Sequence, residues 1–166
     1  MLTSISGIDA IRSDHRLFYG RPGILGERPA NFIMQNSDCL IVIGTRMGIR
    51  ICGYAYDDIA RGATKIMVDV DDTELNKPTF KPDIKVRADA GEFLTALKQV
   101  LPSKSIEREW IKYCDAVKAK YPVVTTAHRH IRKYVSSYVF PEKLSKYVGD
   151  NGIIVTSNGT AYTSTF

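Results

Sequence analysis

Hydrophobic residues gather in short, nearly uninterrupted runs along the chain. Three of them stand at residues 39–44 (CLIVIG), 65–70 (KIMVDV) and 84–89 (IKVRAD), and a fourth at 153–155 (IIV). Such runs, bounded by glycine or acidic residues, are typical of strands that are buried on both faces, as in parallel sheets. The pattern therefore predicts four strands at these positions.

Helical periodicity appears between the runs. Apolar residues at helical spacing, with proline near two of the starts, predict helices over 28–37, 90–101, 105–121 and 141–148, and a short one over 7–12. In the helix at 90–101, the apolar positions 93, 94, 97, 100 and 101 are expected to face inward. Strands that alternate with helices indicate an α/β fold with a parallel sheet.

Composition narrows the class of protein. The 166 residues can form one solid core, and no apolar stretch approaches the roughly 20 residues that span a bilayer, so we expect no membrane partner. Cys39, Cys52 and Cys114 form no C-x-x-C pair and, with the three histidines, no zinc set. We expect reduced, buried thiols and a cytoplasmic location.

Positive charge is concentrated in one segment. Residues 102–147 contain ten Lys/Arg against four Asp/Glu, whereas the whole chain carries +5. A basic segment can meet nucleic acid or an anionic cofactor, or it can be a solvated surface. Because no recognition-helix motif or aromatic platform accompanies it, we expect a solvated linker and no nucleic-acid partner.

Polar residues follow the predicted strands at the edge where ligands bind in open parallel sheets. Arg46 and Arg50 follow the first strand, and Asp69 and Asp71 end the second. Residues 20–26, here called the glycine loop, carry a glycine at every third position before a helix. Helix N-termini and arginine hold phosphates, and acidic residues accept hydrogen bonds from ribose. These residues predict a nucleotide-shaped crevice. The alternative is that the glycines form turns and the aspartates cap a helix near Thr73.

The order of these segments resembles a known family. The stretches GRPGILGERPAN, DCLIVIGTRMGIR and KIMVDVDDTEL are similar to G-M-x-G-M-H-G-x-x-x-A-N, D-L-L-I-x-x-G-x-R-F-D-D-R and K-I-x-x-I-D-I-D-x-x-E-I of the acetolactate synthase large subunit. They resemble the middle domain of thiamine-diphosphate enzymes over about residues 1–101. The resemblance resumes at 139–166, where FPEKLSKYVGDNGIIVTSNGT resembles the start of the pyrophosphate-binding domain.

The resemblance implies a fold and a domain organisation. The fold would be a six-stranded, parallel, doubly wound, Rossmann-like sheet with helices on both faces, followed by a helical linker and an extra strand. Residues 1–101 would form the middle domain, 102–138 the basic helical linker and 139–166 the truncated start of the pyrophosphate-binding domain. The chain would then be a fragment without catalytic residues of its own, because the activating glutamate and the metal motif of relatives lie in other parts.

The resemblance also implies cofactor contacts. In the synthases the middle domain holds FAD, and the turn after the first strand of the last domain approaches the thiamine diphosphate. The corresponding residues are Gly26, Arg46, Arg50, Asp69 and Asp71 for FAD, and Gly159, Thr160 and Ala161 for thiamine diphosphate. The chain departs from the pattern at Ile24-Leu25, where Met-His is usual, at 47–49, which lack the Asp-Asp pair, and at Gly-Thr-Ala in place of Gly-Gln-His.

The resemblance implies the activity of an intact parent enzyme. It would decarboxylate and join 2-oxo acids as a transferase or lyase, with thiamine diphosphate and magnesium, as a homodimer or homotetramer. The resemblance also implies FAD as a further cofactor. The alternatives are a stand-alone FAD- or ADP-binding module and a structural assembly domain, both without catalysis.

Overall fold

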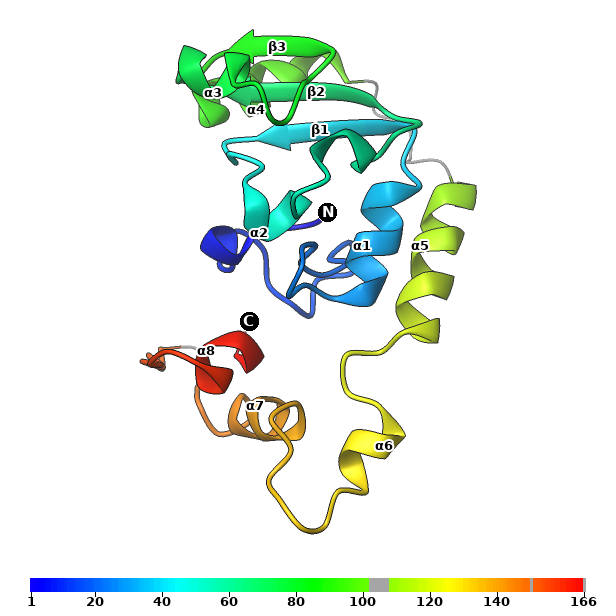
Figure 1. The fold of residues 1–166 in the computed structure, drawn as a ribbon, viewed down its shortest axis with the longest axis vertical. Helices are drawn as coiled ribbons and strands as arrows, with labels where there is room; N and C mark the ends of the chain where they lie inside the picture. Colours follow the sequence, from blue (N-terminus) through cyan, green and yellow to red (C-terminus); the bar gives the residue numbers. More distant parts are fainter. Residues whose placement is uncertain (102–107, 150, 166) are drawn as a thin grey trace. The chain divides into compact units, whose positions relative to one another are not determined.

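The computed structural model describes residues 1–101, 108–149 and 151–165. The chain divides into two compact units, Met1–Lys120 and Tyr121–Phe166. The first unit contains a sheet and most of the helices, and the second contains short helices and connections (Figure 1). No helix among the described residues combines the length and apolar character that crossing a bilayer requires.

The sheet of the first unit is parallel. Its strands are β1 (Cys39–Ile43), β2 (Thr64–Asp69) and β3 (Ile84–Arg87), in the order β1-β2-β3. Ile41 pairs with Ile66 and Ile66 with Ile84, so these three side chains share one face. The α/β class and the first three predicted strands are confirmed. The expected six-stranded sheet is not confirmed, because the described residues form three paired strands.

The predicted helices of the first unit are largely confirmed. They are α1 (Arg28–Gln35), α4 (Ala90–Val100) and α5 (Arg108–Lys120), and the expected start of the last at residue 105 lies outside the described residues. The structure adds α2 (Ile49–Cys52), α3 (Asp72–Asn76) and the 3₁₀ turns η1 (Ile5–Gly7) and η2 (Tyr56–Asp58). The helix expected over 7–12 is wrong: after η1 this stretch continues as turns.

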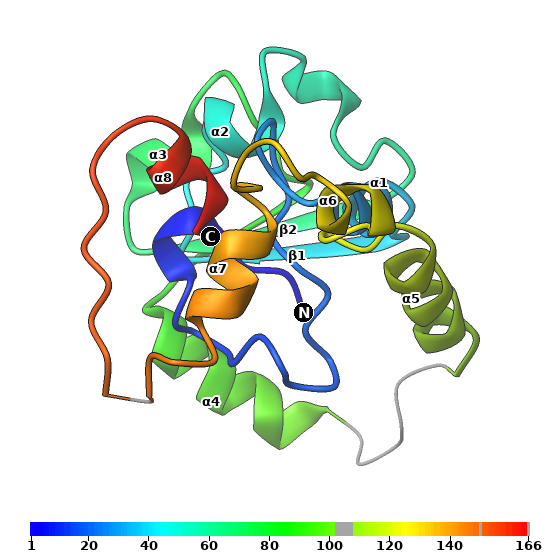
Figure 2. The same ribbon diagram turned by 90° about the horizontal axis from the view of Figure 1, so that it is seen from below.

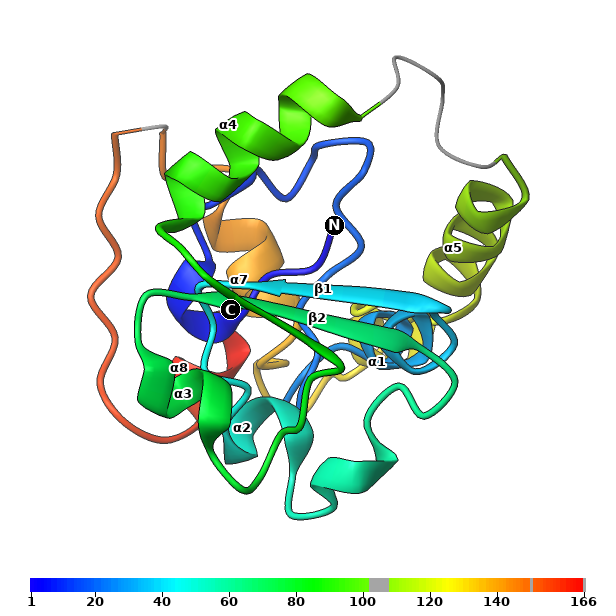
Figure 3. The same ribbon diagram turned by 90° about the horizontal axis from the view of Figure 1, so that it is seen from above.

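One face of the sheet carries the main core. Val42 and Met67 point into it and are 3% and 0% exposed, and they pack with buried residues of α1, α2, α3 and the connections between them. Figure 3 shows α2 and α3 on this side and α4 on the other.

The opposite face is covered at Val68 of β2, which is 0% exposed, and is more open on the flanking strands. Ile41 and Ile84 remain 43% and 47% exposed, and Leu94, Val100 and Leu101 of the α4 segment are at least half exposed. The expectations of a first strand buried on both faces and of an inward apolar face on α4 are therefore wrong in part. The expectation that all three thiols are buried is also wrong, because Cys39 is exposed, whereas Cys52 and Cys114 are buried.

A second core joins α5 to α1. Buried Ile33 of α1, Tyr19 and Cys114 of α5 pack together, with Trp110 and Val117 at the margin. Figures 1 and 2 show α5 running alongside α1. By its packing, α5 is part of the first unit.

The second unit consists of α6 (Thr126–Arg129), α7 (Val139–Leu144) and α8 (Thr160–Ser164). Arg129 of α6 forms a bidentate ion pair with Glu142 of α7, with both N–O distances 2.7 Å. The helix predicted at 141–148 is confirmed as α7, which is shorter and begins earlier. The strand predicted at 153–155 is wrong: this segment has no regular secondary structure, because no described strand pairs with it.

Candidate functional site

The carboxyl edge of the sheet is built by two neighbouring strand ends. The Gly44 N–H donates to the carbonyl of Val68 at 3.0 Å, which extends the pairing of β1 and β2 to the point where both strands stop. Gly44 has φ +60°, and this left-handed turn leads the chain towards Arg46. Asp69 and Asp71 follow β2 at the same edge. The structure therefore brings Arg46, Asp69 and Asp71 together.

Arg46 belongs to a cluster of charged side chains. Its Nε lies 3.5 Å from Oε1 of Glu74, and its side chain is 78% exposed. Glu74 also pairs with Lys77, at 2.9 Å, and the Lys77 ammonium donates to the Arg46 carbonyl. The cluster holds the turn after β1 against α3 and keeps the Arg46 guanidinium at the surface, where an anionic ligand can reach it.

The two aspartates have structural roles as well. Asp71 is the N-cap of α3, and its Oδ1 accepts from the N–H and the hydroxyl of Thr73 at 2.9 and 2.7 Å. These bonds, with the nearby Arg46 and Arg87, lower the pKa of Asp71 below its ordinary value. Asp69 accepts from the Asp71 N–H at 3.0 Å. The capping alternative is therefore confirmed for Asp71, and both carboxylates use Oδ1 in these bonds.

The backbone N–H groups of Gly23 and Gly26 in the glycine loop form hydrogen bonds within the protein. The Gly26 N–H donates to the Gly23 carbonyl at 3.0 Å, and a side chain at Gly26 would lie 2.5 Å from the carbonyl oxygen of Arg21. The Gly23 N–H donates to Asn31 Oδ1 at 2.8 Å. These N–H groups are thus engaged inside the protein, so the loop contributes shape rather than donors for a phosphate.

Arg50 lies in α2 and meets the glycine loop through its backbone. Its carbonyl accepts from the Ile24 N–H at 3.0 Å, and a Cβ at Gly23 would lie 2.2 Å from the same oxygen. Gly23 has φ +138°, so only glycine allows this approach. The predicted site residues of the first unit thus fall into two groups: Arg46 lies near Asp71 at the sheet edge, and Arg50 contacts the loop that contains Gly26.

The remaining predicted residues lie in the second unit. Gly159 has φ +83° and is the N-cap of α8, which begins at Thr160 and includes Ala161. The first N–H groups of a helix lack intrahelical partners and can meet an anion. The expected glycine turn and helix start are present, although the strand before them is not.

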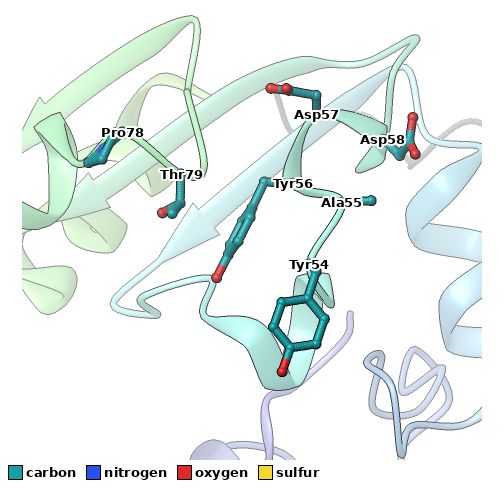
Figure 4. A pocket seen from close by; sticks show the side chains of 7 residues that line it. All are labelled: Tyr54, Ala55, Tyr56, Asp57, Asp58, Pro78 and Thr79. Atoms are coloured by element: carbon teal, nitrogen blue, oxygen red, sulfur yellow. The ribbon is translucent and has the colours of Figure 1, made fainter.

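An open depression of about 390 Å³ lies in the first unit, between the chain around η2 and the segment after α3 (Figure 4). Its lining includes two tyrosines and two aspartates, and in full it consists of Tyr54, Ala55, Tyr56, Asp57, Asp58, Pro78 and Thr79. Sequence reasoning did not find it, because these residues follow no motif and come from two separate connections. Among the described residues no cluster of His, Cys, Asp and Glu could hold a metal ion.

Fold and site define an α/β protein with a parallel sheet and charged side chains gathered at its carboxyl edge. Residues 1–97 match the family described as "Thiamine pyrophosphate enzyme, central domain". The match covers more than half of the chain, and the chain belongs to this family.

Curated relatives extend the match. The acetolactate synthase large subunit of Corynebacterium glutamicum is 29% identical over 96% of this chain and 25% of its own length. The acetolactate synthase isozyme 2 large subunit of Escherichia coli is 30% identical over 67% of this chain and 19% of its own length. The Lactococcus lactis large subunit is 26% identical over 96% of this chain. The chain spans about a quarter of the length of these relatives.

Proposed function

We propose that this chain is the central part of a thiamine-diphosphate-dependent enzyme that decarboxylates and joins 2-oxo acids, as an acetolactate synthase does. The observation that carries the proposal is the similarity to an acetolactate synthase large subunit across 96% of the chain. It includes residues beyond 97, where the central-domain match ends. Bound thiamine diphosphate supplies the carbanion chemistry at the carbonyl carbon, and the protein binds and orients the reactants.

The proposal extends to the organisation of the protein. The central domain would cover residues 1–101, with β1, β2 and β3 as three strands of a six-stranded sheet in the complete protein, followed by a linker at 102–138 and the start of the pyrophosphate-binding domain at 139–166. In this arrangement the chain alone is inactive, and the complete enzyme is a cytoplasmic homodimer or homotetramer that uses magnesium. The turn at Gly159, Thr160 and Ala161 would contact the diphosphate through N–H groups of α8.

The carboxyl edge of the sheet is proposed as a dinucleotide site. The exposed guanidinium of Arg46 suits a phosphate, and Oδ2 of Asp69 and of Asp71 suits ribose hydroxyls. This set of charged groups fits ADP or the ADP half of FAD. Gly26 and Arg50 would shape the crevice beside it. Ile24 and Leu25, which replace Met-His, change the surface that a flavin ring would meet.

Two measurements test the proposal. The protein expressed from the complete reading frame should form acetolactate from pyruvate only with thiamine diphosphate and magnesium, and that frame should contain an upstream pyrimidine-type domain and a downstream Gly-Asp-Gly motif. The 166-residue chain should bind ADP in calorimetry, and Arg46→Gln should weaken this binding about tenfold. A reading frame limited to these residues, with ADP binding and no activity, would instead establish a stand-alone nucleotide-binding module.

A further inference from the structure

Helix α5 holds the segment that leads into the glycine loop. It begins beyond residue 97, outside the part that matches the central-domain family, yet it packs on α1 in the first unit. Cys114 of α5 is 2% exposed and lies against Tyr19, which is 3% exposed. The apolar contact therefore includes the residue directly before Gly20.

Two polar contacts fix the same segment. The Tyr19 hydroxyl donates to Asp115 Oδ1 at 2.8 Å, and the Lys118 ammonium donates to the Phe18 carbonyl at 2.6 Å. Burial, and then the bond to Asp115, raises the pKa of Tyr19 to about 12, so the hydroxyl remains the donor at neutral pH. The Lys118 ammonium also lies 5.9 and 5.7 Å from the ring centroids of Phe18 and Tyr19, within reach of a cation–π interaction.

The other end of the loop touches α2, beside the proposed ligand edge. The Ile24 N–H donates to the Arg50 carbonyl. At Gly23 the loop lies so close to α2 that no side chain would fit between them. A shift of the loop would therefore move α2 or break this contact. Because residues 20–26 connect the two contacts, α5 and α2 hold one short segment between them.

We propose that α5 is a clamp on the glycine loop, and that Tyr19, Asp115 and Lys118 are positioning residues for the ligand at the carboxyl edge. The inference rests on the nucleotide site proposed above. It assigns to a helix outside the family match a role in setting the position of Arg50. Ligand binding and α5 docking would then be coupled, so each would strengthen the other.

The test compares variants of the full 166-residue chain. Tyr19→Phe removes the hydroxyl and keeps the ring, and Lys118→Met removes the ammonium and keeps the stem. Each should weaken ADP binding in calorimetry by about five- to tenfold. Hydrogen exchange of residues 20–26 should accelerate in both variants. Asp115→Ala should behave like Tyr19→Phe, whereas Asp115→Asn keeps an acceptor oxygen and should restore the affinity.

Lys112→Met is the matched control, because Lys112 lies on the exposed side of α5, where it pairs with Glu109. It should change neither ADP affinity nor exchange in the loop. Unchanged ADP affinity in Tyr19→Phe and Lys118→Met would overturn the clamp while the nucleotide site stands. If the unmodified chain binds no ADP, the nucleotide site is overturned and the positioning role with it, and the exchange rates then report only on the packing of α5.

Discussion

The two faces of the sheet have the same apolar character and different surroundings. On one face, Val42 and Met67 are almost completely buried under the segments that contain α1, α2 and α3. On the other, Ile41 and Ile84 lie in register with Ile66 and remain nearly half exposed beside α4. Adjacent residues of a single strand thus have opposite environments, because side chains alternate between faces.

An apolar run in the sequence shows that both faces of a strand could be buried. Which face is actually buried depends on the elements that pack against the sheet. Parallel sheets are usually covered on both faces. The α4-side face of this chain keeps large aliphatic side chains at the surface, with Ile41, Ile84, Leu94, Val100 and Leu101 all more than 40% exposed. Val68 of β2 lies on this same face and is 0% exposed, so the face is covered over β2 and open at Ile41 and Ile84 of the flanking strands. Stability should therefore depend less on these two flanking positions than on the covered face.

The largest expected effect is on the covered face. Met67→Ala removes a side chain that is 0% exposed and should lower the free energy of unfolding by about 2–5 kcal/mol, because it leaves a cavity. Ile41→Ala, on the other face of the neighbouring strand, should cost about 1 kcal/mol. Urea denaturation of both variants measures the difference. Equal losses would show that the α4-side face is as well packed as the other.

The sequence predicted those parts of the fold that depend on local pattern. The strands at 39–44, 65–70 and 84–89 and the helices α1, α4 and α5 follow from hydrophobic periodicity and proline positions. The strand at 153–155 failed because a strand needs a hydrogen-bonding partner, and periodicity does not show whether one exists. The helix at 7–12 failed because local turns, with bonds such as Gly7 N–H to the Ser4 carbonyl, compete there with helix.

The site was predictable where topology alone sets position. Parallel pairing placed Arg46 and Asp71 at one edge, as the strand ends indicated. The self-bonded glycine loop was not foreseeable, because it depends on contacts with Asn31 and Arg50 from other elements. The clamp by Tyr19 and Asp115 joins residues 96 positions apart, a separation that no motif in the sequence reports.

A smaller effect is expected at the start of α4, the helix beside the more exposed face. Asp89 is its N-cap, and Oδ1 accepts from the N–H groups of Gly91 and Glu92 at 2.8 and 3.1 Å. Asp89→Ala should lower the free energy of unfolding by about 1 kcal/mol. Asp89→Ser keeps a capping oxygen and should recover most of it. Thermal unfolding followed by circular dichroism measures both, and a loss near that of Met67→Ala would mean that α4 covers more than its exposed side chains indicate.

The smallest expected effect is on the pH dependence of stability, which should differ between a partly buried carboxyl group and an exposed one. Burial raises the pKa of Glu27 above its ordinary value of 4.5, although Arg21 beside it acts in the opposite direction, whereas hydrogen bonds lower the pKa of exposed Asp71. A raised carboxyl pKa means that the folded state binds the proton more tightly. The stability that Glu27 contributes is therefore fully present below 4.5 and is lost as pH rises through its folded pKa.

For Asp71 the sign is opposite: its contribution is present above the ordinary value and is lost as pH falls through the lowered one. The contributions of Glu27 and Asp71 can be separated by melting temperatures measured from about pH 3 to about pH 7. The measurement compares the unmodified chain with Glu27→Gln and Asp71→Asn. Relative to the unmodified chain, Glu27→Gln should lose stability towards low pH, and Asp71→Asn should lose it towards neutral pH. Parallel profiles for the two variants would show that the interactions with Arg21 outweigh burial at Glu27, and the contrast between covered and open regions would then not extend to charge.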